Sequence, residues 1–371
     1  MKIAISTLHA QHNNYGTILQ SVALQKYIES KGHSVETVDY SPAVYKYGVT
    51  DLKSFIVRWG VNLMFAPQFL IRSHRFNKFI YEYNTLTPNR YFSYEELLKN
   101  PPKADVYISG SDQIWNPRFP CGRDDAFYLK YINSSNKMAY ASSTGTDLTD
   151  DEYKQLIDKI SNYKFVSVRE KIAKEKLNEL GKNDVVHVCD PVALLSKEQY
   201  RKMTTFKPKD SYILVYAINK DPLLEEAVIK LAKITHLRII VIGGFAKKCD
   251  SDFFMRSAGP SEFLGLMDNA SYVITSSFHG LMFSLIFEKQ FIIIEPAINK
   301  LRLRSITDIT NTSGRIVNNL DKLEQLVNSP INYSNVSILF KRFVNDSKNY
   351  LDSALSWFEK AIGEKNDSIN Q

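Results

Sequence analysis

The sequence predicts an α/β protein with two Rossmann-like, doubly wound domains that face each other across a cleft. Three observations support this prediction. Short β-branched apolar runs alternate with amphipathic helical segments along the chain, which is typical of parallel sheets covered by helices. The second half repeats the arrangement of the first. The 371 residues also exceed the length that one hydrophobic core usually supports.

The first half opens with a strand, "KIAIST", and an amphipathic helix that ends at Gly32, a residue favoured just beyond a helix C-terminus. Further strands are expected at 34–40, 104–110, 137–143, 163–168 and 184–191. A less regular, aromatic-rich insertion occupies about residues 41–100. The first domain is therefore expected over residues 1–207, with a linker at Pro208–Asp210.

The second half follows the same alternation, which predicts a second domain over residues 208–333. Its strands are expected at 211–218, 238–244, 271–277 and 291–297, with helices near 222–235, 261–268 and 279–288. A long helix at about 334–361 dominates the C-terminal segment, residues 334–371. Ligands of doubly wound sheets bind where loops leave the carboxyl ends of the strands, so the cleft between the domains is the expected site.

Composition excludes several classes of function. The net charge of +7 is spread along the chain, which suits an anionic small molecule or membrane surface better than nucleic acid. Cys121, Cys189 and Cys249 are too far apart for a zinc site or a disulfide framework, so a cytoplasmic protein is expected. Dinucleotide and Walker A fingerprints are absent, and Asp250–Asp252 fits a turn better than a metal site.

One apolar segment, "FIVRWGVNLMFAPQFLI" at Phe55–Ile71, approaches the length of a membrane span. Arg58, Asn62 and Gln68 interrupt it, and Lys53, Arg72 and Arg75 flank it. Two interpretations stay open: a helix lying in the membrane interface, or a buried or groove-lining helix pair.

Two loops of the first half follow strands and carry candidate binding groups. In "HNNYGTILQ", Asn14, Tyr15 and Gly16 open a helix whose amides suit an anion or a sugar oxygen, although a plain capped turn explains them equally. In "SGSDQIWNP", Asp112 and Gln113 follow Ser111 and would hold hydroxyls. Trp115 would stack on a sugar ring, and the alternative is a turn whose tryptophan covers the core.

Two charged residues occupy equivalent strand-to-helix junctions in the two halves. Arg169 in "VSVRE" would grip a carboxylate or phosphate, and its alternative is a surface ion pair with Glu170. His279 in "SSFHG" has the side chain best suited to proton transfer near neutral pH, and its alternative is a packed structural residue. The two junctions would project toward one cleft.

Six ordered segments resemble the polysaccharide pyruvyl transferase family. They are "NNYGTILQSVALQKYI", "YISGSDQIWNP", "AYASSTG", "VSVRE", "VCDPVALL" and "SSFHGLMFSLIF", and the resemblance runs from about residue 2 to about residue 310. It implies two Rossmann-like domains in a GT-B-like arrangement. It also implies transfer of a pyruvyl group from phosphoenolpyruvate to two hydroxyls of a sugar, forming a ketal on a surface or capsular polysaccharide or its lipid-linked precursor. No metal or redox cofactor is implied.

The resemblance also implies roles for residues. Arg169 would bind phosphoenolpyruvate and His279 would be the general acid that protonates its C3 atom. The first-half loops, with Asn14, Tyr15, Gly16, Ser111, Asp112, Gln113 and Trp115, would bind the acceptor. The donor site would also include Ser277, Phe278 and Gly280, with Gly280 allowing a tight turn and close approach of a ligand.

The chain departs from the family at one donor position. Some members have Arg-Leu-His where this chain has Ser277-Phe278-His279, so Arg302 or Arg304 would supply the second anion contact. Two other functions stay open. One is a GT-B-type glycosyltransferase that uses a nucleotide sugar, and the other is a non-catalytic glycan-binding relative. An enzyme with a lipid-linked acceptor would work at the inner face of the membrane, where Phe55–Ile71 would be the contact.

Overall fold

The computed structural model describes residues 1–9, 14–42, 66–217, 221–243, 253–296 and 300–369. The chain forms two compact units. The first unit comprises residues 1–49, 80–194 and 342–371, and the second comprises residues 50–79 and 195–341. The division therefore falls at residues 194 and 195 rather than after residue 207, because helix α8 (Lys197–Arg201) contacts helix α10 (Pro260–Asn269) of the second unit.

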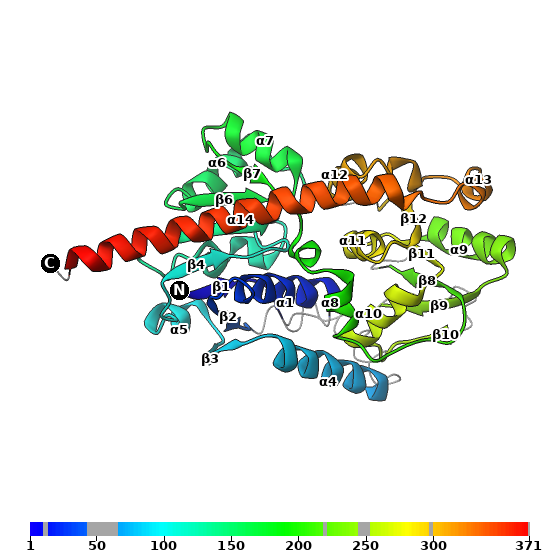
Figure 1. Ribbon diagram of the computed structural model, residues 1–371, viewed down its shortest axis with the longest axis horizontal. Helices are drawn as coiled ribbons and strands as arrows, with labels where there is room; N and C mark the ends of the chain where they lie inside the picture. Colours follow the sequence, from blue (N-terminus) through cyan, green and yellow to red (C-terminus); the bar gives the residue numbers. More distant parts are fainter. Residues whose placement is uncertain (10–13, 43–65, 218–220, 244–252, 297–299, 370–371) are drawn as a thin grey trace. The chain divides into compact units, whose positions relative to one another are not determined.

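The first unit is built on a seven-stranded sheet with the order β3-β2-β1-β4-β5-β6-β7 (Figure 1). All of its strand pairs are parallel. Its strands are β1 (Lys2–Ser6), β2 (Ser34–Tyr40), β3 (Leu86–Tyr91), β4 (Val106–Ser109), β5 (Lys137–Ser142), β6 (Phe165–Val168) and β7 (Val186–His187). The order reverses between β1 and β4, as in a Rossmann sheet.

Strand β3 lies in the region predicted to be an irregular insertion. Its sequence, "LTPNRY", includes Pro88, which lacks an amide hydrogen and so does not suit a central strand. β3 pairs only with β2 and forms the edge of the sheet, where a proline is tolerated. The described part of this region therefore contains regular structure that extends the sheet.

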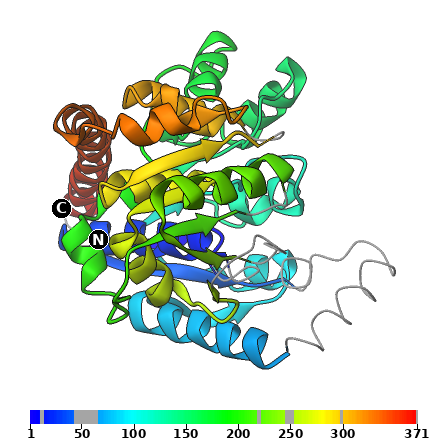
Figure 2. The same ribbon diagram turned by 90° about the vertical axis from the view of Figure 1, so that its right-hand side faces the viewer.

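The second unit contains a six-stranded sheet with the order β10-β9-β8-β11-β12-β13, and its strands lie side by side in Figure 2. The strands are β8 (Tyr212–Tyr216), β9 (Arg238–Ile242), β10 (Phe253–Phe254), β11 (Tyr272–Thr275), β12 (Gln290–Ile294) and β13 (Ile316–Val317). All pairs are parallel, and the order again reverses at one point, between β8 and β11. The predicted α/β class with two doubly wound parallel sheets is confirmed.

Both faces of the second sheet are buried, which explains why its strands are continuous apolar runs. Ile213 and Val215 of β8 pack in a core with helix α9 (Pro222–Thr235). Tyr216 points to the opposite face, where its ring lies 5.3 Å from that of Phe263. Phe263 in turn lies 5.3 Å from the ring of Phe283.

Helices connect the strands and cover the sheets. The remaining α-helices are α1 (Tyr15–Glu29), α4 (Ala66–Tyr83), α5 (Tyr94–Lys99), α6 (Asp150–Lys159), α7 (Lys171–Glu179), α11 (Phe278–Ile286), α12 (Lys300–Ile309), α13 (Leu323–Asn328) and α14 (Tyr333–Ile369). α14 is the predicted long final helix. Gly32, with a φ of 87°, follows the C-terminus of α1 as predicted.

The apolar segment Phe55–Ile71 lies mostly outside the described residues, and only its last six residues belong to α4. Two of the cations predicted to flank it make contacts within the protein. Arg72 is buried with its guanidinium 5.2 Å from the Phe76 ring centroid, and Arg75 pairs with Glu262 at 3.2 Å. Across the described ranges, no helix is both long and apolar enough to cross a membrane.

Candidate functional site

Several of the predicted site residues lie in loops at the point where the strand order reverses in each sheet. In the first unit, the Thr7 hydroxyl after β1 donates to the Ser111 carbonyl after β4, at 2.8 Å. In the second unit, the Thr275 hydroxyl at the end of β11 donates to the Tyr216 carbonyl of β8, at 2.6 Å. Each loop set therefore lies at the carboxyl edge of its sheet, where doubly wound proteins bind ligands.

The first unit holds a buried ionic cluster, the Arg169 cluster, made by Asp112, Arg169, Glu170 and Asp190. Arg169 is 1% exposed and its guanidinium donates to Asp190. Its other nitrogens lie 3.9 Å from carboxylate oxygens of Asp112 and of Glu170. The loops after β4, β6 and β7 thus bring three carboxylates around one guanidinium.

The three carboxylates stabilise the buried positive charge of Arg169, so this charge does not require an anionic ligand. Burial lowers the pKa of Arg169, but the nearby carboxylates of Asp190, Glu170 and Asp112 outweigh burial and raise it above its ordinary value. The surface ion pair considered from the sequence is wrong, because the side chain is buried. The three carboxylates also leave the cluster with an excess of negative charge, which is unfavourable for an anionic donor within this unit.

Asp112 has a backbone conformation that side chains rarely adopt, with a φ of 73°. Its carboxylate accepts hydrogen bonds from the Thr17 hydroxyl at 2.7 Å and the Gln113 amide at 2.8 Å. Local strain of this kind persists where the surroundings fix it, and it is frequent at functional sites. The loop is thus a rigid part of the carboxyl edge.

Trp115 and Ser111 are too deeply buried for the contacts predicted from the sequence. Trp115 is 1% exposed, stacks on Tyr128 with a centroid distance of 6.2 Å, and meets the edge of Tyr163. Ser111 is fully buried and donates to the Ala141 carbonyl. Sugar stacking on Trp115 is therefore contradicted, and its alternative role of covering the core is the observed one.

The other residues predicted to bind the acceptor surround the start of α1 and the loop after β4. Asn14 caps α1, since its side chain accepts from the Gly16 amide at 3.0 Å. Tyr15 and Gly16 are buried in the first turn. Gln113 is partly exposed and accepts from the Asn116 side chain at 2.9 Å. His12 and Asn13, from the same motif as Asn14, lie outside the described residues.

The second unit places His279 in the first turn of α11, directly after β11. His279 is 6% exposed, and its ring meets that of Phe278 edge-on at 5.4 Å. Ser277, at the N-cap, is 1% exposed, and its hydroxyl has no hydrogen-bond partner among the residues that the structure describes. A buried polar group of this kind calls for a partner, and the start of a helix favours an anion.

The structure distinguishes Arg302 from Arg304, which the sequence left open. Arg302 is 8% exposed, and its guanidinium carbon lies 5.6 Å from the centroid of the Phe278 ring. The Arg304 side chain is 49% exposed and forms a bidentate pair with Glu295, at 2.5 and 2.9 Å. Arg302 is therefore the cation that lies beside the His279 turn.

Gly280 has a different role from the one predicted. Its φ is not positive, so no unusual turn requires a glycine, and it sits inside α11. A Cβ at this position would lie 2.1 Å from Oγ1 and 2.8 Å from Cβ of Thr275. Glycine is needed here because α11 packs directly against the end of β11, which fixes the position of the His279 turn.

We expect Gly280→Ala to lower the free energy of unfolding by about 1–3 kcal/mol, because the added methyl overpacks a buried contact. Urea denaturation measures this change. The matched control is Gly363→Ala on α14, where a Cβ meets nothing within 4 Å. That control should be neutral or slightly stabilising, since alanine favours helices. Equal stabilities of Gly280→Ala and the wild type would contradict the packing argument.

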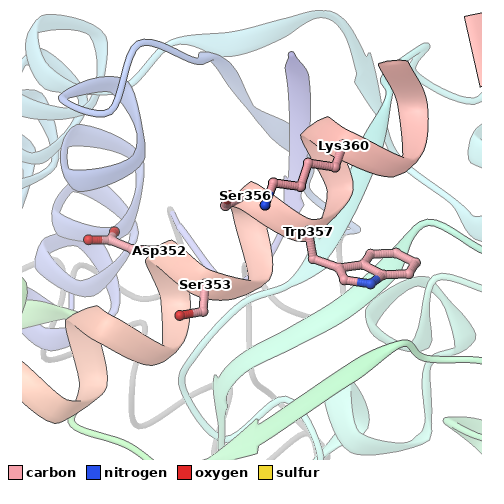
Figure 3. Close-up of a pocket in the computed structure, with 5 residues that line it drawn as sticks. All are labelled: Asp352, Ser353, Ser356, Trp357 and Lys360. Atoms are coloured by element: carbon pink, nitrogen blue, oxygen red, sulfur yellow. The ribbon is translucent and has the colours of Figure 1, made fainter. Parts of the chain in front are cut away.

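A hollow of about 460 Å³ lies on α14 of the first unit and is lined by Asp352, Ser353, Ser356, Trp357 and Lys360 (Figure 3). The Trp357 ring meets Phe165, the first residue of β6, at 5.6 Å, so the hollow lies at the amino end of that strand. The Asp352 carboxylate already accepts from Tyr27 and Lys31. The hollow is therefore away from the predicted site residues of this unit.

Sequence reasoning missed two groups at the carboxyl edge of the first sheet. Asp190 follows β7 and pairs with Arg169. The signal in the sequence that could have revealed it is an aspartate directly after a predicted strand, between Cys189 and Pro191. His9 follows β1 as His279 follows β11; it is fully buried, and its Nε2 lies 3.3 Å from the Asp39 carboxylate.

The described segments contain neither a cluster of metal ligands nor a reactive thiol. Within them, no group of three or more His, Cys, Asp or Glu side chains is arranged to hold a metal ion. Burial raises the pKa of the Cys121 thiol to about 12 and that of the Cys189 thiol to about 11, so both are poor nucleophiles. Cys249 and Asp250–Asp252 lie outside the described residues.

Several solved structures are similar to this chain at low sequence identity. UDP-N-acetylglucosamine 2-epimerase from Rickettsia bellii has a TM-score of 0.56 and 11% identity, covering 97% of each chain. UDP-GlcNAc 2-epimerase from Methanocaldococcus jannaschii has a TM-score of 0.51 and 13% identity, covering 90% of this chain and 93% of that one. AviGT4, a glycosyltransferase involved in avilamycin A biosynthesis, has a TM-score of 0.51 and 11% identity, covering 97% and 98%.

At these identities the likeness shows the fold alone, which is the predicted GT-B-like class of two Rossmann-like domains. None of the curated proteins compared with the chain matches it. The family model described as "Polysaccharide pyruvyl transferase" matches residues 14–297, most of the chain, including the loops that carry Asp112, Arg169 and His279. The chain belongs to the polysaccharide pyruvyl transferase family.

Proposed function

We propose that this protein transfers a pyruvyl group from phosphoenolpyruvate to two hydroxyls of a sugar, forming a ketal during polysaccharide biosynthesis in the cytoplasm. The observation that carries this proposal is the turn at the start of α11, where His279 and Arg302 lie next to Phe278. The Ser277 hydroxyl of the same turn has no hydrogen-bond partner within the part of the chain that the structure describes. The membership of the chain in its family supports the reaction class.

The chemistry of this turn suits an anionic donor. Phosphoenolpyruvate carries a carboxylate and a phosphate, and both need cations or amide donors. Arg302 supplies a guanidinium, Ser277 supplies a hydroxyl, and the N-terminus of α11 supplies backbone amides with a favourable dipole. We therefore propose that Arg302 supplies the anion contact that some family members obtain from an arginine at the position of Ser277.

The proposed reaction uses His279 as the proton donor. Protonation of C3 by His279 gives C2 oxocarbenium character, and a sugar hydroxyl adds to C2 and loses its proton. A second hydroxyl then attacks C2 as the bond from C2 to the phosphate oxygen breaks, and phosphate leaves with the electron pair of that bond. The departing phosphate takes the proton of the second hydroxyl, and the proton lost by the first hydroxyl restores protonated His279. The histidine stays within the first turn of a helix fixed by Gly280, which keeps the proton donor in place.

The acceptor is proposed to bind at the loops of the first unit around Asn14, Gln113 and Asp112. Asp112 and Gln113 present oxygen and amide groups in a loop whose backbone is held by Ser143, and the Thr17 hydroxyl fixes the Asp112 carboxylate. Carboxylates favour neutral hydroxyl donors over an anion, so the Arg169 cluster supports an acceptor side rather than a donor side. We propose neither a metal nor a redox cofactor for this reaction.

Ligand protection tests the proposed donor against the glycosyltransferase alternative. Phosphoenolpyruvate alone should raise the melting temperature of the protein, whereas a nucleotide sugar should not. Incubation with phosphoenolpyruvate and a panel of galactosides and lipid-linked sugars should then release phosphate and add the pyruvyl mass to one sugar. Protection by a nucleotide sugar only would favour a glycosyltransferase. Protection by glycans without turnover would favour the non-catalytic relative.

We expect Arg302→Gln to weaken phosphoenolpyruvate binding by about 2–5 kcal/mol, because it removes a buried cation that faces an anion. Arg304→Gln is the matched control and should change binding by less than about 1 kcal/mol, since Arg304 is exposed and engaged with Glu295. Calorimetric titration measures both, with circular dichroism as a check on folding. A larger effect for Arg304 than for Arg302 would reverse the assignment.

A further inference from the structure

The solvent-facing side of α4 has an unusual composition for a helix of a globular protein. Leu70 is 71% exposed and Ile71 is 46% exposed, and Tyr81 farther along the same unbroken helix is 72% exposed. The opposite side of the helix is also apolar, with Phe76 and Phe79 buried. A helix whose outer side is not polar usually contacts a further apolar phase.

A lysine and a histidine accompany these exposed apolar side chains. At 100° per residue, Leu70, Ile71, His74, Lys78 and Tyr81 fall within one arc of about 100°, which we call the α4 outer face. His74 and Lys78 are exposed, and residues 66–81 contain no aspartate or glutamate. The first acidic residue is Glu82, beside the edge of this arc. The α4 outer face therefore combines apolar bulk with positive charge.

We propose that the α4 outer face binds the surface of an anionic lipid bilayer. Leucine and isoleucine would enter the boundary between headgroups and acyl chains, tyrosine suits the interface itself, and Lys78 would contact lipid phosphates. A second copy of the chain fits less well, because a symmetric contact would bring the Lys78 side chains of both copies into one interface with no carboxylate on the face to balance them. This inference is independent of the proposed reaction.

Another exposed apolar pair on α14 offers a chemically matched control. Ile338 is 67% exposed and Leu339 is 37% exposed, so the pair has the same two side-chain types, although here the isoleucine is the more exposed of the two. A carboxylate accompanies this pair, because Glu288 accepts from Ser337 at 3.1 Å and interacts with Lys341. The control pair is therefore as apolar as Leu70 and Ile71, but a carboxylate lies near it, whereas the α4 outer face has none.

Vesicle co-sedimentation of the full-length protein tests the proposal. The wild type should bind vesicles of mixed phosphatidylcholine and phosphatidylglycerol and should bind pure phosphatidylcholine much less. Leu70→Gln/Ile71→Gln should lower the partition coefficient roughly tenfold or more, and Lys78→Gln should lower it about fivefold on anionic vesicles only. Ile338→Gln/Leu339→Gln should bind like the wild type.

Three outcomes would overturn the proposal. The first is absence of wild-type binding to anionic vesicles, and the second is equal binding by the α4 and α14 double variants. The third is a change from dimer to monomer in Leu70→Gln/Ile71→Gln, measured by light scattering, which would assign the face to a second copy of the chain. The substituted side chains are exposed, so circular dichroism and the melting temperature should match the wild type.

Discussion

Replacement of Arg169 by methionine is expected to lower the free energy of unfolding by about 3–5 kcal/mol, which would make it one of the most destabilising single substitutions in the chain. Methionine keeps much of the volume of the arginine side chain, so little of the effect would come from a cavity. The loss comes from the carboxylates of Asp112, Glu170 and Asp190, which would lose the guanidinium that they share. Urea denaturation measures the change.

The control for this prediction is Arg118→Met. Arg118 pairs with Glu152, but its side chain is 48% exposed, so its removal should cost no more than about 1 kcal/mol. Titration with phosphoenolpyruvate separates the two roles of Arg169. If Arg169→Met is as stable as the wild type and no longer binds phosphoenolpyruvate, the arginine is a donor ligand, as first predicted from the sequence, and the structural explanation is wrong.

Replacement of His279 by glutamine is expected to lower turnover by about 10²- to 10⁴-fold, because the chain would lose the proposed proton donor to C3. Glutamine is polar and similar in size to histidine, so the contact between side chains 278 and 279 in the first turn of α11 should be largely kept. Turnover is measured as phosphate release together with the gain of pyruvyl mass on the acceptor, per folded molecule.

His187→Gln provides the matched histidine control. Burial lowers the pKa of His187 to about 4, so this imidazole is not a proton donor near neutral pH, and its Nε2 lies 3.1 Å from the Arg169 carbonyl. This variant should lose stability but keep its turnover per folded molecule. A His279→Gln variant that unfolds easily and still turns over would instead assign His279 a structural role.

The sequence predicts the architecture well because its signals are local. Continuous apolar strands such as Tyr212–Tyr216 and amphipathic helices such as Pro222–Thr235 are visible within a short window. The helix Tyr15–Glu29 was also predicted to be amphipathic, and that detail is wrong, because it is buried on nearly all sides. The junction that holds His279 is predicted for the same reason, since a strand that turns into a helix has a recognisable pattern. Strand β3 was not predicted, because it contains Pro88, which is tolerated only at the edge of a sheet. The order of strands, which places β3 at the edge, is not encoded within a short window of sequence.

The surroundings of the candidate residues depend on contacts that are remote in sequence. Arg169 meets Asp190 and Asp112 only because β4, β6 and β7 end at the same edge of one sheet. Trp115 is enclosed by Tyr128 and Tyr163, which no pattern around it reveals. The choice between Arg302 and Arg304 also depends on remote contacts, since Arg302 lies against Phe278 and Arg304 pairs with Glu295.

The path of the chain through the first unit has a consequence for its synthesis. This unit is assembled from three separate segments, and the last one carries most of α14. Asp352 of that helix accepts hydrogen bonds from Tyr27 and Lys31, which precede it by 325 and 321 residues. A ribosome therefore completes the second unit before the final piece of the first unit emerges. The sheet of the first unit stays uncovered by this part of α14 until residues 342–369 have been translated.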